Sequence, residues 1–429
     1  MTVSTYLLVA WIALLGADRI DLLGGDGLFL LTPFLILTPV YLTYETIRVA
    51  VFRERLTAWK NAPVYSLLLL VFLSVVVLST FGSTDILASA RRSLLLVALS
   101  LGTLSVALLA AGRAQLERAL VLGAEVGLAI AVLFGAFQIA VVVTLIPDEF
   151  RVGYLSVDLM PMRYAGLFPR LSGQVVDANR AGLLFLFYLF VLGKWANPGP
   201  RRRAWVTIGI VLLLLTLSRS ALLAAACVAA VAAWSAWKGR LSPRVMLTTT
   251  SCVALVTALL LASPNLRGQV GRALEPLGAR FSLSEGSAQD HRSLLERGIE
   301  EATVSVRRAA VGAGYGESFL LLQDIFPGNR YGNFHSLFLT VMVESGVFAL
   351  ILCLVLLGVP LIYDSPLRPM VAGLVGFNLF YQSLSEPTFW FVLALAWLSL
   401  RYSGPAGADA KSGNLPTAPL IRPMEPVAR

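Results

Sequence analysis

The residues of this sequence best suited to catalysis lie in one polar stretch, residues 287–346, inside a chain that is otherwise mostly apolar. The stretch contains both histidines of the protein, His291 and His335, and His335 lies where polar sequence gives way to an apolar run. A neutral imidazole can accept a proton from a hydroxyl group, which makes His335 a candidate general base. An isolated histidine at such a position is more often a helix cap or an interfacial anchor, but the neighbouring arginines favour the catalytic role.

Arg219 is the second candidate, because it is the only charged residue between Ala204 and Trp237. A charge in the middle of an apolar helix is costly, so this run is predicted to form two helices with Arg219 at their turn. At that place the guanidinium could lie among lipid headgroups, or it could point inward and bind an anionic ligand. The sequence leaves both interpretations open.

The polar loops supply further arginines. Many of them have acidic residues nearby in the same loop, and these are expected to form solvated salt bridges of little energetic consequence. One or two could instead make forked contacts to a diphosphate, because guanidinium geometry matches phosphate oxygens. The additional candidates for substrate contacts are Arg163, Arg180, Arg297 and Arg308. Near Arg180, the side chains of Asp177 and Asn179 are predicted to cap the helix that begins there.

The composition indicates what kind of protein must position these side chains. Of 429 residues, 57% are hydrophobic and only 14% are charged, which is typical of a membrane protein with many spans. The predicted fold class is therefore an all-α polytopic membrane protein with about twelve transmembrane helices. The apolar segments fall at about 2–17, 26–46, 63–82, 93–112, 118–146, 176–196, 204–218, 220–237, 245–263, 336–362, 369–385 and 387–401.

Basic residues predict the orientation of these segments. Lysines and arginines gather in alternate short loops, which the positive-inside rule places in the cytoplasm. Both termini are then inside, and both long loops, 147–175 and 264–335, are outside. Arg91 and Arg92 do not fit this pattern. We expect a single transmembrane domain, residues 1–401, followed by a disordered, proline-rich cytoplasmic tail, 402–429.

The net charge and the cysteines indicate which partners and cofactors this protein is expected to bind. The net charge of +9 comes largely from arginines in short loops, so it predicts contact with membrane lipids or a lipid-linked phosphate and not with nucleic acid. The three cysteines, Cys227, Cys252 and Cys353, lie in apolar runs without CxxC spacing. Neither a disulfide framework nor a metal site is indicated, and no cofactor is predicted.

The long outer loop between the ninth and tenth segments is predicted to be partly helical. A helix at about 290–309 would carry apolar residues on one side and charges on the other, so it would lie on the membrane surface or roof a cavity. The stretch Gly312-Ala-Gly-Tyr-Gly316 follows. It lacks the preceding strand of a nucleotide-binding loop, so we interpret it as a flexible turn and not as a phosphate cradle.

Four segments together resemble the superfamily of O-antigen ligases and O-antigen polymerases, which are bacterial inner-membrane glycosyltransferases of the GT-C type. The segments are RYAGLFPRLSGQVVDANRAG (163–182), LTLSRSALLAAA (215–226), HRSLLERGIEEATVSVRRAAVGAGYG (291–316) and NFHSLFLTVMVESGVFAL (333–350). The resemblance covers about residues 160–365. By position, it implies that Arg219 and Arg292 bind the diphosphate of the donor and that His335 is the base that activates the acceptor hydroxyl.

The resemblance also implies a reaction. An O-antigen ligase transfers a glycan from undecaprenyl diphosphate to a lipid A core sugar on the periplasmic face of the inner membrane, whereas an O-antigen or exopolysaccharide polymerase joins repeat units. A lipid-linked glycan flippase, the alternative from another class, would show charges in several helices and an internal repeat. No Asp-x-Asp motif stands in the outer loops, and positioned cations can stabilise a diphosphate leaving group. A metal-independent, inverting transfer is therefore expected.

Overall fold

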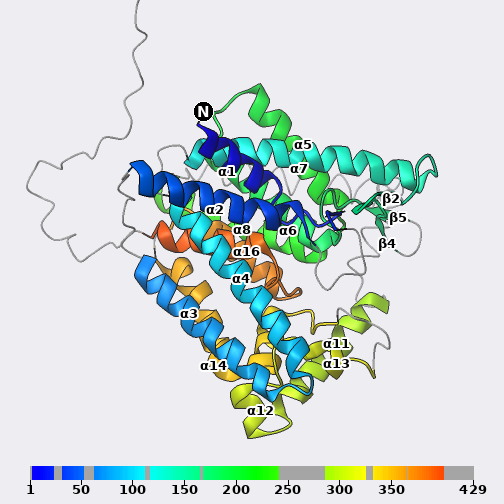
Figure 1. The fold of residues 1–429 in the computed structure, drawn as a ribbon, viewed down its shortest axis with the longest axis vertical. Coiled ribbons are helices and arrows are strands. Elements are labelled where there is room, and N and C mark those ends of the chain that lie inside the picture. Colours follow the sequence, from blue (N-terminus) through cyan, green and yellow to red (C-terminus); the bar gives the residue numbers. More distant parts are fainter. Residues whose placement is uncertain are drawn as a thin grey trace, which may run out of the picture.

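The computed structural model describes residues 2–23, 31–52, 62–111, 116–164, 168–240, 286–324, 332–363 and 365–400. Helices dominate this part of the chain (Figure 1). The first group is α1 (Val3–Ala13), α2 (Pro33–Phe52), α3 (Ala62–Ser79), α4 (Ile86–Ala111), α5 (Leu116–Val142), α6 (Ala178–Trp195), α7 (Pro200–Leu215) and α8 (Arg219–Arg240). The second group is α11 (Gly286–Thr303), α12 (Val306–Val311), α13 (Ser318–Leu321), α14 (Leu337–Ile362), α15 (Arg368–Asn378) and α16 (Pro387–Leu398).

The apolar segments of the sequence correspond to these helices. A helix overlaps each predicted segment except 245–263, which lies outside the described residues, as does the predicted tail, 402–429. Five of the described helices, α2, α3, α4, α5 and α14, are long and apolar enough to cross a membrane. The chain is thus a multi-pass membrane protein of mostly helical structure, and the count of twelve spans stays a prediction.

Helix α16 lies in the centre of the bundle. All of its residues are buried, and it contacts α3, α4, α6, α14 and α15. Its aromatic side chains pack against distant helices: the ring of Trp397 stacks on Tyr65 with centroids 5.5 Å apart, and Phe391 meets Trp11 edge-on at 4.9 Å. A helix that is apolar on every side is stable only when it is buried. This burial fixes the residues just before α16, which take part in the candidate site.

All described strands lie at one end of the bundle, where α5 ends and α6 begins (Figure 1). We call this the loop end. A three-stranded antiparallel sheet has the order β1 (Ile20–Asp21), β3 (Leu155–Asp158), β2 (Glu149–Val152), and β4 (Met162–Tyr164) pairs with β5 (Phe168–Arg170). The all-α prediction therefore missed a small amount of sheet in the loop 147–175. The signal was present, because apolar and polar residues alternate on both sides of Gly153.

The helix predicted at 290–309 is in fact two helices. Helix α11 ends at Thr303, and Ser305 begins α12 as an N-cap whose side chain accepts a hydrogen bond from the backbone N–H of Arg308 at 3.2 Å. Leu294 and Ala302 of α11 are buried against Phe334 and Val343 of the α14 region. The amphipathic character is confirmed, and α11 packs on α14.

The glycine-rich stretch 312–316 is a turn, as predicted, but it is packed tightly against a break in α14 and is not the flexible connection that the sequence indicated. Gly346 leaves helical geometry with φ 80°, which frees carbonyl groups of the preceding turn. The backbone N–H groups of Ala313 and Gly314 donate to the carbonyls of Val343 and Glu344, at 2.8 and 2.9 Å. A Cβ atom on Gly312 would come within 2.3 Å of the Glu344 carbonyl oxygen. Close backbone approach therefore accounts for glycine here.

Arg92, which did not fit the charge pattern, has a structural role. Its guanidinium donates a hydrogen bond to the carbonyl of Gly316 and lies 5.8 Å from the ring centre of Phe319. Nearby, the Glu317 carboxylate accepts from the backbone N–H groups of Thr84 and Asp85, at 3.0 and 3.2 Å, at the start of α4. These contacts hold the α3–α4 turn to the segment 312–319.

Candidate functional site

The N-terminal ends of α6, α8, α14 and α16 meet at the loop end, and an ion-pair network joins two of them. Arg180, in the first turn of α6, lies with Nη1 2.5 Å from Oδ2 of Asp18 and with Nε 2.5 Å from Oε1 of Glu386, which immediately precedes α16. The side chain of Glu386 is only 5% exposed and that of Arg180 22% exposed. Two carboxylates therefore neutralise a guanidinium that is mostly removed from solvent.

Tyr381 links this network to the start of α14. It is buried in the connection between α15 and α16, near the carboxylates of Asp177 and Glu386. The backbone carbonyl of Tyr381 accepts a hydrogen bond from the backbone N–H of Leu337 at 3.0 Å. The phenol ring of Tyr381 lies edge-on to the imidazole of His335, with the ring centroids 6.5 Å apart.

His335 stands two residues before α14 in a left-handed backbone conformation, with φ 49°. Its N–H donates to the side-chain oxygen of Asn333 at 2.8 Å, and the N-cap position of the helix belongs to Ser336. Burial lowers the pKa of His335 to about 4. The imidazole is therefore neutral near pH 7, which is the protonation state that a general base needs.

Arg219 lies at the predicted turn. Helix α7 ends at Leu215 and α8 begins at Arg219, so the prediction of two helices is confirmed. The turn is fixed by Ser218, whose hydroxyl donates to the side-chain oxygen of Asn179 at 2.9 Å. Arg219 is thereby held next to the first turn of α6, with its side chain partly exposed.

The capping prediction holds for one of two residues. Asp177 is the N-cap of α6 and accepts from the backbone N–H groups of Asn179 and Arg180, at 2.6 and 3.1 Å. Asn179 is not a cap, because its side-chain oxygen accepts instead from Ser218 and from Nη2 of Arg170, both at 2.9 Å. Asn179 therefore connects β5, α6 and the α7–α8 turn.

The other arginines that were predicted to contact the substrate lie in different surroundings. Nη2 of Arg297 lies 3.2 Å from Oε1 of Glu301 and 3.4 Å from Oδ2 of Asp324. Arg308 forms an ion pair with the same Glu301. These pairs hold α11, α12 and the turn after α13 together. Arg292 belongs to α11 and Arg163 to β4, but their side chains are outside the described part of the structure.

Sequence reasoning missed three members of the network: Asp18, Tyr381 and Glu386. Asp18 and Glu386 are both single acidic residues at the end of an apolar segment, which is a signal for a functional or paired charge in a membrane protein. Tyr381 carries no such signal. Among the described residues, no group of three or more His, Cys, Asp or Glu side chains is arranged to hold a metal ion.

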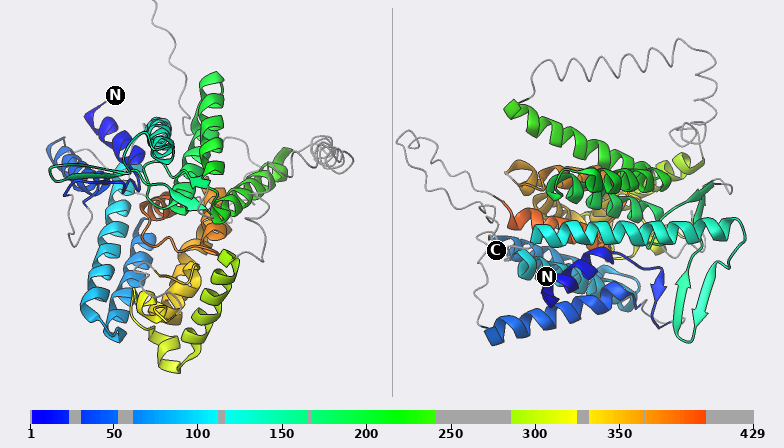
Figure 2. Two further views of the ribbon diagram at one scale, coloured as in Figure 1. Left: turned by 90° about the vertical axis from the view of Figure 1, so that its right-hand side faces the viewer. Right: turned by 90° about the horizontal axis from the view of Figure 1, so that it is seen from above.

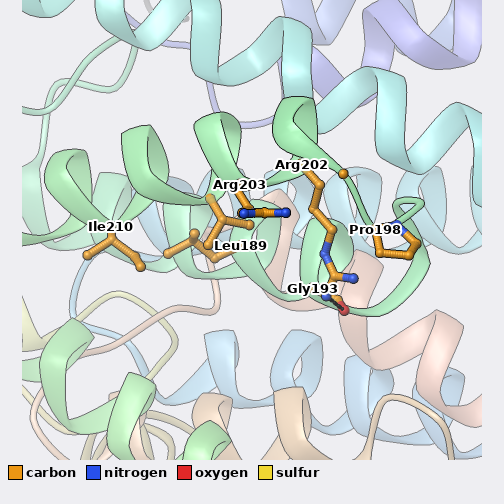
Figure 3. A pocket seen from close by; sticks show the side chains of 8 residues that line it. Leu189, Gly193, Pro198, Arg202, Arg203 and Ile210 are labelled. Atoms are coloured by element: carbon orange, nitrogen blue, oxygen red, sulfur yellow. Dashed lines mark hydrogen bonds between the residues drawn. The ribbon is translucent and has the colours of Figure 1, made fainter.

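A pocket lies at the opposite end of the bundle. It has a volume of about 630 Å³ and lies between α6 and α7, with apolar walls that include Leu189 and Ile210 (Figure 3). Arg202 and Arg203 border it, and Arg202 donates to the carbonyl of Gly193 at 2.6 Å. These arginines belong to the loops predicted to be cytoplasmic. The pocket is therefore separate from the candidate site.

Comparison with known proteins supports the resemblance seen in the motifs. Residues 204–354 match the model of a protein family described as O-antigen ligase. The matched region contains Arg219, Arg292 and His335, whereas Arg180 and Glu386 lie outside it. A comparison with curated proteins gives no match.

Proposed function

We propose that this protein is an O-antigen ligase, which transfers a glycan from undecaprenyl diphosphate to a lipid A core sugar on the periplasmic face of the inner membrane. The observation that carries the proposal is the placement of a half-buried, neutral His335 beside Tyr381, at the end of the bundle where Arg219 also lies. The match of residues 204–354 to the O-antigen ligase family supports the substrate class.

In the proposed reaction, His335 accepts the proton of the acceptor hydroxyl as that oxygen attacks the anomeric carbon of the donor sugar. The new glycosidic bond forms on the face opposite the leaving group, and the bond between the anomeric carbon and the diphosphate oxygen breaks. Undecaprenyl diphosphate leaves with the bonding electrons. The configuration of the anomeric carbon is inverted.

In the proposed reaction, arginine side chains stabilise the negative charge of the leaving diphosphate. Arg219 and Arg292 are the proposed ligands, because forked guanidinium contacts match phosphate oxygens and need no metal ion. Arg180 has a different role, since its charge is already matched by Asp18 and Glu386. We assign to it the positioning of the α6 and α16 ends around Tyr381.

A polymerase of the same superfamily is the alternative, because the same base and diphosphate ligands would serve if the acceptor hydroxyl belonged to a second lipid-linked glycan. A gel of lipopolysaccharide from a deletion strain separates the two activities. Lipid-linked polymer that accumulates unattached to core supports the ligase. Core carrying a single repeat unit would identify a polymerase, and an unchanged ladder would contradict both.

A further inference from the structure

The hairpin formed by β2 and β3, residues 149–158, has one apolar face and one polar face. Cross-strand partners share a face, and successive residues alternate between faces. The pairs Phe150 with Val157 and Val152 with Leu155 therefore lie on one side. The pairs Glu149 with Asp158 and Arg151 with Ser156 lie on the other, where Nε of Arg151 is 2.5 Å from Oε1 of Glu149.

The apolar face is covered at its base and uncovered at its tip. At the base, Val157 and Ile20 pack against a cluster that contains Phe134 and Val141 of α5. Phe150, opposite Val157, is 41% exposed, and toward the tip the exposed fractions are 74% for Val152, 37% for Leu155 and 78% for Tyr154 in the turn. Large apolar side chains in this arrangement need a partner of low polarity.

The position of the hairpin indicates which partner covers it. The hairpin runs across the end of α5, which is long and apolar enough to span a membrane (Figure 2). Val143 and Leu145, just beyond α5, are themselves 53% and 76% exposed, so exposed apolar side chains continue along the chain from the span toward the hairpin. The hairpin thus has an apolar face next to a membrane span and a charged face on its other side. Such an element suits a position at the boundary between the lipid headgroups and the acyl chains.

The hairpin is also fixed rigidly to the candidate site. Arg19, which is 1% exposed, donates from Nη1 to the carbonyls of Asp158 and Met160 at the end of β3, at 2.9 and 3.1 Å. The adjacent residue, Asp18, pairs with Arg180. A hairpin held at the membrane surface would therefore fix the height of the α6 end relative to that surface.

We propose that the apolar face of residues 149–158 inserts into the lipid leaflet at the loop end and that its polar face remains in water. Tyr154 would then lie at headgroup level, where aromatic side chains are enriched in membrane proteins. The inference rests on the sheet register and on the exposed surface, and it does not depend on the reaction proposed above.

Site-directed spin labelling tests this with a matched pair of neighbours. Full-length protein lacking its native cysteines receives one label, at Val152→Cys or at Arg151→Cys, and is placed in lipid nanodiscs. Power saturation then measures the collision of each label with oxygen, which partitions into lipid, and with a water-soluble nickel chelate. We expect the ratio of oxygen to nickel accessibility to be several times higher at position 152 than at position 151.

Two outcomes would overturn the proposal. Equal, high accessibility of both labels to the nickel chelate would show that the apolar face is in water. A label at position 152 that is shielded from both reagents would show a protein contact instead of lipid. Because both positions are exposed on the hairpin, neither substitution removes a packed side chain. Thermal unfolding of the two labelled variants checks that the fold is retained.

Discussion

Arg180 and Glu386 form an ion pair, with Nε and Oε1 2.5 Å apart, that joins the start of α6 to the start of α16. The two residues lie far apart in the sequence, and the pair lies near Tyr381, whose ring is edge-on to His335. Such a contact is a structural requirement of the site because it fixes two helix ends whose own residues are mostly apolar.

Removing Arg180 should therefore destabilise the protein. Arg180→Ala would leave the carboxylates of Asp18 and Glu386 without their common partner in a mostly desolvated place. Loss of one member of a buried ion pair costs about 3–5 kcal/mol, and partial exposure of Arg180 places the expected effect toward the lower end of that range. Thermal unfolding in detergent measures this, with Arg203→Ala on the exposed face of α7 as the control. An equal midpoint for the two variants would contradict the structural role.

The proposed diphosphate contacts predict a difference between alanine and lysine. Arg219→Ala and Arg292→Ala should each reduce transfer severely while the protein remains in the membrane. Lysine at either position should restore activity only in part, because an ammonium group cannot reproduce forked contacts to two phosphate oxygens. Transfer assays with a lipid-linked donor provide the measurement, and Arg203→Ala again serves as the control. Lysine variants with full activity would argue against forked diphosphate binding.

How far the sequence predicts this site depends on whether a residue interacts locally. The turn at Arg219 was predictable because one charge interrupts an apolar run, and the cap at Asp177 depends only on its own helix. The role of Asn179 and the pairing of Arg180 with Glu386 were not predictable, since both depend on how α6, α8 and α16 pack. The β2–β3 hairpin is an intermediate case, because its alternation is present in the sequence but short strands in a polar loop give a weak signal.

Transfer should not require a divalent metal ion. In the proposed reaction, arginine side chains supply the positive charge that a metal would place on the diphosphate. Purified enzyme treated with EDTA should therefore keep its full transfer rate. A rate that falls in EDTA and returns with Mg²⁺ or Mn²⁺ would disprove metal independence.

The last prediction concerns the base. Because burial lowers the pKa of His335 to about 4, the free enzyme holds a neutral imidazole down to about pH 5. The acid limb of kcat/KM should therefore lie near pH 4, whereas a solvent-exposed histidine would place it near 6.5. Binding of the donor diphosphate adds negative charge, which favours the protonated ring and should move the acid limb of kcat to higher pH than that of kcat/KM. Steady-state rates across about pH 3 to 8 test both statements.

Substitution of His335 must separate chemistry from backbone strain, because the residue has a φ of 49°. Asparagine tolerates the left-handed conformation better than alanine does, but it cannot accept the proton, so His335→Asn should fold normally and lose roughly 10² to 10⁴ in rate. His335→Ala should lose at least as much and should also be less stable. If His335 were only an interfacial anchor, His335→Asn would turn over normally per folded molecule and would keep the wild-type pH profile. That result would remove His335 from the mechanism, and single-turnover rates normalised to folded protein are the measurement that decides it.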